Sequence, residues 1–102
     1  MLTMIEMRRA ELVDLCRRLG VRRLELFGSA TRGDFDPVDS DLDFLVEFSP
    51  SATRRALDSY FSLKEALEAL FDRPVDLVMP DAITNPYVRA DIEQSRVTLY
   101  AA

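Results

Sequence analysis

The sequence predicts one α/β (α+β) domain over residues 1–102, built as a small mixed β-sheet with helices packed on it. Stretches of helical periodicity alternate along the chain with short apolar segments typical of strands. The length of 102 residues allows a single core without disulfides or a structural metal. A composition of 48% hydrophobic and 30% charged residues is typical of a globular protein, and no repeat or linker-like tract divides the chain.

The first half of the chain predicts one helix, two strands and the turn between them. Apolar residues at helical spacing, ending before Gly20, predict a helix over about residues 4–19: Leu12, Leu15, Cys16 and Leu19. Cys16 falls on its buried face, which indicates a core residue. Residues 21–27 predict a strand that ends at Gly28, followed by a turn or short helix up to Gly33. Alternation over residues 41–48 predicts a second strand, with one face turned to the core: Leu42, Phe44, Val46 and Phe48.

The second half predicts a helix, a strand, a second helix and a last strand. An apolar stripe predicts a helix over about residues 52–71: Ala56, Tyr60, Leu63, Leu67 and Leu70. Residues 73–78 predict a short strand, which Pro80 stops. Asn85 followed by Pro86 indicates a helix N-cap with proline at the first helical position, and this helix continues to about Ser95. Residues 97–100 predict an edge strand.

The composition excludes several kinds of chemistry. With no histidine, the chain has no Ser-His or Cys-His pair and no imidazole metal ligand. The formal net charge of −5 argues against direct DNA binding and against attachment to a membrane surface. A single cysteine, no long apolar run and no secretory signal predict a cytoplasmic protein. The groups that remain available for catalysis or binding are carboxylates, hydroxyls, guanidinium groups and the backbone.

The excess negative charge is concentrated in one segment. Five aspartates lie between residues 34 and 43, and they equal the whole net charge: Asp34, Asp36, Asp39, Asp41 and Asp43. One interpretation is a solvated loop rich in turn-forming aspartate. The other is a cation site, and it concerns the two aspartates on the predicted second strand.

Asp41 and Asp43 are two positions apart on that strand, so both carboxylates project from one face, about 6.6 Å apart at the backbone. Carboxylates in such a pair suit Mg²⁺. Two charges about 5 Å apart repel by roughly 3 kcal/mol at an effective dielectric constant of 20, so without metal one of the pair should be partly protonated. Asp76 is the one charged residue in the otherwise apolar segment 74–78 of the third predicted strand. It marks either the solvent end of that strand or the third member of a metal site.

Gly28 and Ser29 stand where the first strand gives way to the turn. Glycine allows the backbone to approach a phosphate closely, amide groups at a helix start favour anions, and Arg32 is the nearest cation. The alternative is a tight turn that needs a positive φ at Gly28 and uses Ser29 as an N-cap.

The combination of these features resembles a known signature. The segment Leu-Phe-Gly28-Ser29-Ala-Thr-Arg32-Gly33, followed after an acidic connection by Ser40-Asp41-Leu-Asp43-Phe-Leu-Val, resembles the nucleotidyltransferase superfamily that includes DNA polymerase β. It is most similar to the minimal nucleotidyltransferases (MNT), and the resemblance extends over the chain to Asp76 and to Asn85-Pro86-Tyr87. Two departures are the eleven residues between Ser29 and Asp41, where small members often have ten, and Ala30 at a position that is often basic.

The resemblance implies a polymerase β-like core and a metal-dependent nucleotidyltransferase. It implies that Gly28 and Ser29 hold the triphosphate of ATP, with Arg32 as the neighbouring cation. Asp41, Asp43 and Asp76 would be the catalytic carboxylates that bind Mg²⁺, two ions in all, and Asp76 is the best candidate to take the acceptor proton.

The resemblance also implies a partner. Minimal members commonly accompany a HEPN-domain toxin and act as its antitoxin by transferring AMP from ATP to a tyrosine on it, and this is the leading hypothesis. One alternative is a non-catalytic antitoxin that neutralises its partner by contact alone, although a pure binder would not need the acidic residues. Another is a nucleotidyltransferase acting on a small molecule or an RNA end, although relatives of that kind usually carry an additional domain for the acceptor.

Overall fold

The computed structural model describes residues 3–32, 41–50 and 56–102. The predicted order of elements is confirmed, with one short 3₁₀ helix in addition. The elements are α1 (Thr3–Met7), α2 (Arg9–Arg18), β1 (Val21–Phe27), α3 (Ser29–Arg32), β2 (Leu42–Phe48), α4 (Ala56–Phe71), β3 (Val75–Val78), η2 (Pro80–Ala82), α5 (Pro86–Ser95) and β4 (Val97–Ala101). Asp34, Asp36 and Asp39, and the predicted start of the helix over 52–71, lie outside the described residues.

The strands form one mixed sheet in the order β3-β2-β1-β4, as the fold class predicts. β1 runs antiparallel to both β2 and β4, whereas β2 and β3 are parallel. β4 lies at an edge, as predicted, and β3 forms the other edge. The strand that carries Asp43 is therefore an inner strand of the sheet.

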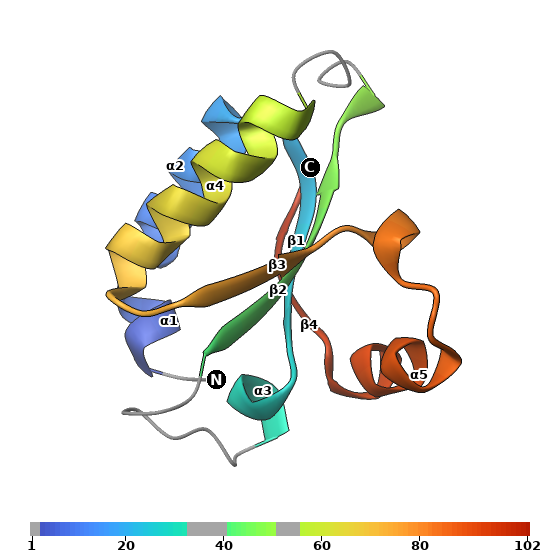
Figure 1. Cartoon of the computed structure of the whole chain (residues 1–102). Coiled ribbons are helices and arrows are strands. Elements are labelled where there is room, and N and C mark those ends of the chain that lie inside the picture. The colour runs from blue at the N-terminus through green and yellow to red at the C-terminus, as the bar shows by residue number, and fades with distance from the viewer. Residues whose placement is uncertain (1–2, 33–40, 51–55) are drawn as a thin grey trace.

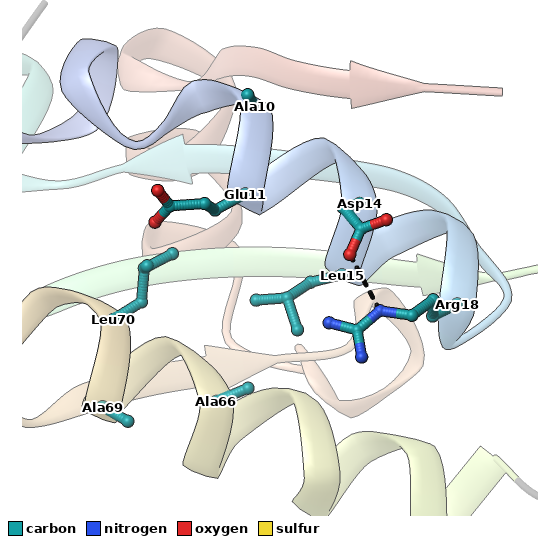
Figure 2. A pocket seen from close by; sticks show the side chains of 8 residues that line it. All are labelled: Ala10, Glu11, Asp14, Leu15, Arg18, Ala66, Ala69 and Leu70. Carbon is teal, nitrogen blue, oxygen red and sulfur yellow. Dashed lines mark ion pairs between the residues drawn. The ribbon is translucent and has the colours of Figure 1, made fainter.

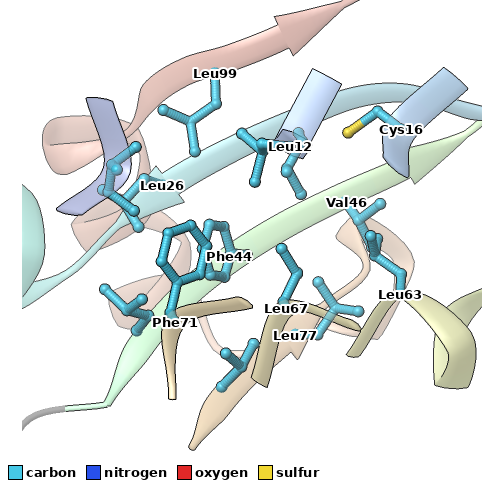
Figure 3. Close-up of a cluster of buried hydrophobic side chains, with 14 of the residues drawn as sticks. Leu12, Cys16, Leu26, Phe44, Val46, Leu63, Leu67, Phe71, Leu77 and Leu99 are labelled. Carbon is cyan, nitrogen blue, oxygen red and sulfur yellow. The ribbon is translucent and has the colours of Figure 1, made fainter. Parts of the chain in front are cut away.

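Helices cover the two faces of the sheet unequally. Helices α1, α2 and α4 lie on one face, while α5 and η2 lie on the other (Figure 1). The larger apolar cluster lies under α2 and α4, where β2 contributes three fully buried side chains: Leu42, Phe44 and Val46 (Figure 3). The predicted core face of this strand is thus confirmed, and Phe44 stacks on Phe71 with ring centroids 6.2 Å apart.

Cys16 belongs to the same cluster and is fully buried, as predicted. Burial raises the pKa of its thiol to about 12. A thiol that stays protonated is a poor nucleophile, so Cys16 acts as a small core residue.

The N-terminal helix differs from its prediction, because the expected helix over 4–19 is two helices, α1 and α2. The helix is interrupted at Arg8. The Arg8 amide donates to the carbonyl oxygen of Ile5, three residues earlier, at 3.2 Å. Arg8 itself lies outside helical geometry, at φ −110° and ψ 14°. The break lets Ile5 reach the core, where it is fully buried, and α2 continues with Leu12 and Cys16 on its buried face.

The later helices follow their local signals. In α4, Leu63 and Leu67 are fully buried, and the Tyr60 hydroxyl donates to the Leu77 carbonyl oxygen of β3. At α5, the Asn85 side chain accepts a hydrogen bond from the Tyr87 amide at 2.8 Å, which confirms the predicted cap. In the part of the chain that the structure describes, no helix has the length and apolar character to cross a membrane.

Two substitutions on α4 test this assignment of the core. Leu63→Ala should lower the free energy of unfolding by about 2–5 kcal/mol, because it opens a cavity at a fully buried site. Phe61→Ala, at a side chain that is 54% exposed, should change it by about 0.5 kcal/mol or less. Chemical denaturation of both variants gives the comparison, and equal losses would contradict the burial of this helix.

Candidate active site

Asp41 and Asp43 lie at the start of β2 and share one side of it. Asp43 is half-buried within the strand, and Asp41 is exposed immediately before it. Between and after them, Leu42 and Phe44 are fully buried on the opposite face. The core therefore fixes the direction in which Asp43 points, as the alternation predicts.

Asp76 lies beside Asp43 on the neighbouring strand. The two residues are register partners in the parallel β2–β3 pair, so their side chains leave the same face of the sheet. Val75 and Leu77, on either side of Asp76, are buried on the core face. Asp76 is exposed to solvent on an edge strand, as the first interpretation predicts, and it also adjoins Asp43; its membership of a metal site stays a prediction.

The electrostatics of the site act mainly on Asp43. Its pKa is raised from 3.8 to about 6, first by burial and then by the negative charges of Asp76 and Asp41. Arg32 lowers this pKa, and Asp91 raises it. Of the Asp41–Asp43 pair, Asp43 is thus the member whose ionised form is disfavoured when no cation is present.

The chemistry of these side chains fits a hard divalent cation, although a complete set of ligands is not assembled around one point. Among the residues that the structure describes, no group of three acidic or cysteine side chains is close enough to hold a metal ion. The carboxylates of Asp43 and Asp76 nevertheless share one face on adjacent strands, and their repulsion is of the kind that a bound cation relieves. The role of Asp41, Asp43 and Asp76 as metal ligands remains a prediction.

Gly28 lies directly against the Asp43 carboxylate. It has a positive φ of 76°, and a Cβ atom at this position would be 2.4 Å from Asp43 Oδ2. Both the backbone conformation and the close approach therefore require glycine. Helix α3 begins at Ser29, so Gly28 rather than Ser29 occupies the cap position, and the amide and hydroxyl of Thr31 both donate to the Gly28 carbonyl oxygen.

Helix α5 supplies two residues of the site that the sequence alone did not indicate. The Arg32 guanidinium pairs with the Asp91 carboxylate at 2.5 Å, and the Gly28 amide donates to Ser95 Oγ at 3.1 Å. Ser95 is buried together with Ile92, three residues earlier on the same helix. A polar residue on the apolar side of a predicted helix is the signal that would have drawn attention to Ser95.

Glu25 is a third residue that the sequence alone did not indicate. It lies on β1, and only 4% of it is exposed. Thr98 Oγ1 donates to Glu25 Oε2 at 3.4 Å, and the guanidinium groups of Arg96 and Arg23 approach Oε1 at 3.8 and 4.0 Å. Glu25 pairs with Leu45 in the β1–β2 register, so it shares the face of Asp43. An acid within the apolar segment Leu-Glu25-Leu-Phe was the available signal, of the same kind as Asp76.

Two cavities lie on opposite sides of the sheet. A groove of about 620 Å³ runs between α2 and α4 and is lined by Ala66, Ala69, Leu70 and their neighbours (Figure 2). It belongs to the helical layer and is remote from the carboxylates. A cavity of about 550 Å³ is lined by Leu45, Ile83 and Ile92, with Arg89 and Arg96 beside them. Because Leu45 is two residues from Asp43 on the same strand face, this second cavity is the one that adjoins the site.

The site thus combines a glycine turn against an inner-strand carboxylate with a second acid in register. The model of the nucleotidyltransferase domain family matches residues 10–99, and the chain belongs to this family. The resemblance to minimal nucleotidyltransferases is thereby confirmed. The match covers β1, β2 and β3, the first three residues of β4, and all six residues proposed from the sequence for the site.

Curated relatives indicate which kind of nucleotidyltransferase the chain is similar to. The chain is 41% identical over 70 residues to the protein adenylyltransferase MntA of Thermococcus cleftensis, a match that covers 69% of this chain and 67% of the relative. It is 36% identical over 77 residues to a provisionally assigned protein adenylyltransferase of Methanocaldococcus jannaschii, covering 76% of this chain and 75% of the relative.

Solved structures share the fold. One, provisionally assigned as a minimal nucleotidyltransferase, superposes with a TM-score of 0.73 at 35% identity, over 91% of this chain and 90% of the other. A toxin–antitoxin structure with AMP-PNP gives a TM-score of 0.63 at 20% identity, over 92% and 73%. A complex of tri-AMPylated Shewanella oneidensis HEPN toxin with MNT antitoxin gives 0.61 at 16% identity, over 95% and 72%. At such low identities the last two establish the polymerase β-like fold alone.

The contact between Gly28 and Asp43 leads to a direct test. Gly28→Ala should destabilise the protein by more than Gly20→Ala, because both glycines have positive φ but only the first substitution also places Cβ against a carboxylate. The φ strain costs about 1–2 kcal/mol in each variant. Thermal denaturation measures both, and equal losses would contradict the close approach.

The raised pKa of Asp43 predicts how stability depends on pH. The folded pKa of about 6 exceeds the ordinary value of 3.8, so the ionised carboxylate destabilises the fold above pH 6 and this penalty disappears as the pH falls towards 4. Without divalent cations, Asp43→Asn should therefore stabilise the protein at about pH 8, by roughly 1–2 kcal/mol once solvent screening of a half-exposed group is allowed for.

The control for this measurement is Asp58→Asn, at an exposed position on α4, which should change the free energy of unfolding at about pH 8 by about 0.5 kcal/mol or less. Thermal melts in EDTA from about pH 4 to pH 8 make the comparison. An Asp43→Asn variant no more stable than the parent at about pH 8 would show that the carboxylate is not under electrostatic strain.

Proposed function

We propose that this protein transfers AMP from ATP to a side-chain hydroxyl of a HEPN-domain partner and thereby acts as the antitoxin of a toxin–antitoxin pair. Membership of the nucleotidyltransferase family and the similarity to named protein adenylyltransferases support the reaction. The observation that carries the proposal is the position of Asp43, between the Gly28 backbone and the carboxylate of Asp76. A binding module would have no use for a carboxylate held at this electrostatic cost.

The triphosphate of ATP is assigned to the β1–α3 turn. The close approach of Gly28 to Asp43 brings this turn against the carboxylates. Ser29 begins α3, and amide groups at a helix start favour anions. Arg32 ends α3, with a guanidinium near enough to lower the pKa of Asp43. These three residues thus bring hydrogen-bond donors and a positive charge to the side of the acidic residues.

Asp41, Asp43 and Asp76 would hold Mg²⁺, two ions by family resemblance. Bound Mg²⁺ would neutralise phosphate charge, lower the pKa of the acceptor hydroxyl and stabilise the departing pyrophosphate. The carboxylates themselves supply hard oxygen donors in the preferred coordination of this ion. Asp43 must be ionised for this purpose, which its raised pKa still permits at neutral pH.

The proposed reaction is an in-line displacement at the α-phosphorus of ATP. The acceptor oxygen forms a bond to this phosphorus as the bond to the bridging oxygen of the β-phosphate breaks, and pyrophosphate leaves with that electron pair. The acceptor proton passes to Asp76, which is exposed on an edge strand and open to an incoming side chain. Arg32 and the β1–α3 turn hold the leaving phosphates.

The acceptor is a tyrosine hydroxyl in this proposal, presented by the partner protein. The cavity over Leu45, Ile83 and Ile92 adjoins Asp43 and gives room for a substrate group beside the carboxylates. Toxin–antitoxin complexes among the structures with the same fold, one of them with an AMPylated HEPN toxin, suggest a partner of this kind.

We place this reaction in the cytoplasm. Its donor, ATP, is a cytoplasmic metabolite. The one cysteine of the chain is a free, buried thiol, which suits a reducing compartment.

The decisive experiment combines the protein with ATP labelled at the α-phosphate, Mg²⁺ and a HEPN-domain partner protein. Label should pass to the partner and be lost by about 10³-fold or more in the Asp41→Asn, Asp43→Asn double variant, because the proposed ligands are removed. The control is Asp58→Asn, Glu65→Gln, which removes the same charge from exposed positions on α4, across the sheet. Mass spectrometry of the partner identifies the modified residue.

Three outcomes would contradict parts of the proposal. Undiminished transfer by the double variant would show that these aspartates are not the ligands. Neutralisation of the toxin without ATP, and equally by the double variant, would establish an antitoxin that acts by contact. Modification of a small molecule in place of the partner would assign a different acceptor.

A further inference from the structure

The turn that carries Gly28 is held in place from helix α5. Ser95 Oγ accepts the Gly28 amide at 3.1 Å and donates to the Asp91 carbonyl oxygen at 2.8 Å, so the hydroxyl has a partner in each direction. Ser95 is only 9% exposed, and 67 positions separate it from Gly28 in the sequence. Its hydroxyl is therefore a buried bridge between the last turn of α5 and the end of β1.

The same helix also holds the cation of the site. Asp91, one turn before Ser95, pairs with Arg32 at the other end of α3. Helix α5 therefore holds α3 at both ends. Ser95 contacts the backbone of Gly28, just before α3, and Asp91 contacts the side chain of Arg32, the last residue of α3. Phe27 and Leu45 pack with Ile92 on the sheet beneath, which fixes the position of α5 itself.

The hydrogen bond from Gly28 decides what this residue can do. Because its amide donates to Ser95, the importance of Gly28 lies in how closely its backbone approaches Asp43 Oδ2. A shift of the turn would move either the glycine into the carboxylate or the carboxylate away from Asp76. The bond to Ser95 fixes this spacing.

Asp91 acts on Arg32 in a different way. A guanidinium has its five N–H donors in a rigid plane, so an ion pair with Asp91 orients the whole group. Loss of the Asp91 charge would leave Arg32 less well directed but would not move the β1–α3 turn.

We propose that Ser95 and Asp91 are positioning residues for catalysis, Ser95 acting through Gly28 on Asp43 and Asp91 acting through Arg32 on the nucleotide. This inference rests on the proposed nucleotidyl transfer. It distinguishes two effects: Ser95 governs the turnover number, whereas Asp91 governs the affinity for ATP.

The test of Ser95 uses a matched pair of substitutions. Ser95→Thr and Ser95→Val add nearly the same volume at a buried position and differ in the hydroxyl alone. With Mg²⁺, ATP and the HEPN-domain partner, Ser95→Val should lower kcat by about tenfold or more, because small displacements of reacting groups are costly. Ser95→Thr should retain most of the activity. Equal kcat values for the two variants would overturn the role of the hydroxyl.

Asp91→Asn provides a test that does not depend on repacking a buried site, because the Asp91 side chain is 47% exposed. The KM for ATP should rise about fivefold with little change in kcat, since one charge-assisted contact to Arg32 is weakened. Asp58→Asn, the same substitution at an exposed position on α4 across the sheet, is the charge-matched control. A change in kcat alone, or equal effects of the two variants, would overturn this assignment.

Binding of AMP-PNP with Mg²⁺, measured by calorimetry on the full chain, separates this inference from the proposed reaction. If the parent protein binds AMP-PNP but modifies no partner, the acceptor assignment fails, and a weaker binding of Asp91→Asn than of Asp58→Asn still supports the role of Asp91. If the parent protein and its complex with the partner both fail to bind AMP-PNP, the positioning roles are overturned together with the nucleotide site.

Discussion

The contact between the Gly28 backbone and the Asp43 carboxylate is the constraint on which the site depends. It requires a positive φ at one residue and a half-buried, protonatable carboxylate at the other, and each of these is unfavourable for folding. The fold sustains both because Leu42 and Phe44 are fully buried on the opposite face of the same strand. Turning the Asp43 position of the strand to the opposite face would require those side chains to leave the core.

The two faces of the sheet have different tasks. The face under α2 and α4 holds the larger apolar cluster and supplies most of the stability. The other face has a small cluster of four buried residues: Phe27, Leu45, Ile83 and Ile92. That cluster stabilises little by area, but it seats α5 beside the β1–α3 turn. Helix α5 then contributes Asp91 and Ser95, so the small cluster matters chiefly because it positions the site.

Features that depend on local sequence were predictable, and those that depend on distant contacts were not. The alternation over residues 42–48 predicted both the core face of β2 and the direction of Asp43, and Asn85-Pro86 predicted the start of α5. The break at Arg8 reflects the fit of Ile5 into the core, which no local pattern reveals. The bond between Gly28 and Ser95 joins residues 67 positions apart, and a single sequence carries no signal for such a pairing.

The charges around Asp43 explain why such a site would need divalent cations rather than histidine. The groups that act on its pKa comprise the acids Asp41, Asp76 and Asp91 and one base, Arg32; with Asp43 itself, the ionised site has a net charge of −3. A nucleotide triphosphate is also strongly negative, so the carboxylates would repel it. The two Mg²⁺ ions of the proposed mechanism would reverse the sign of this charge. The single positive charge of Arg32 cannot reverse the sign of the site, and the negative charge of Asp91 cancels it. The role that we propose for Arg32 is therefore to orient phosphate rather than to attract it.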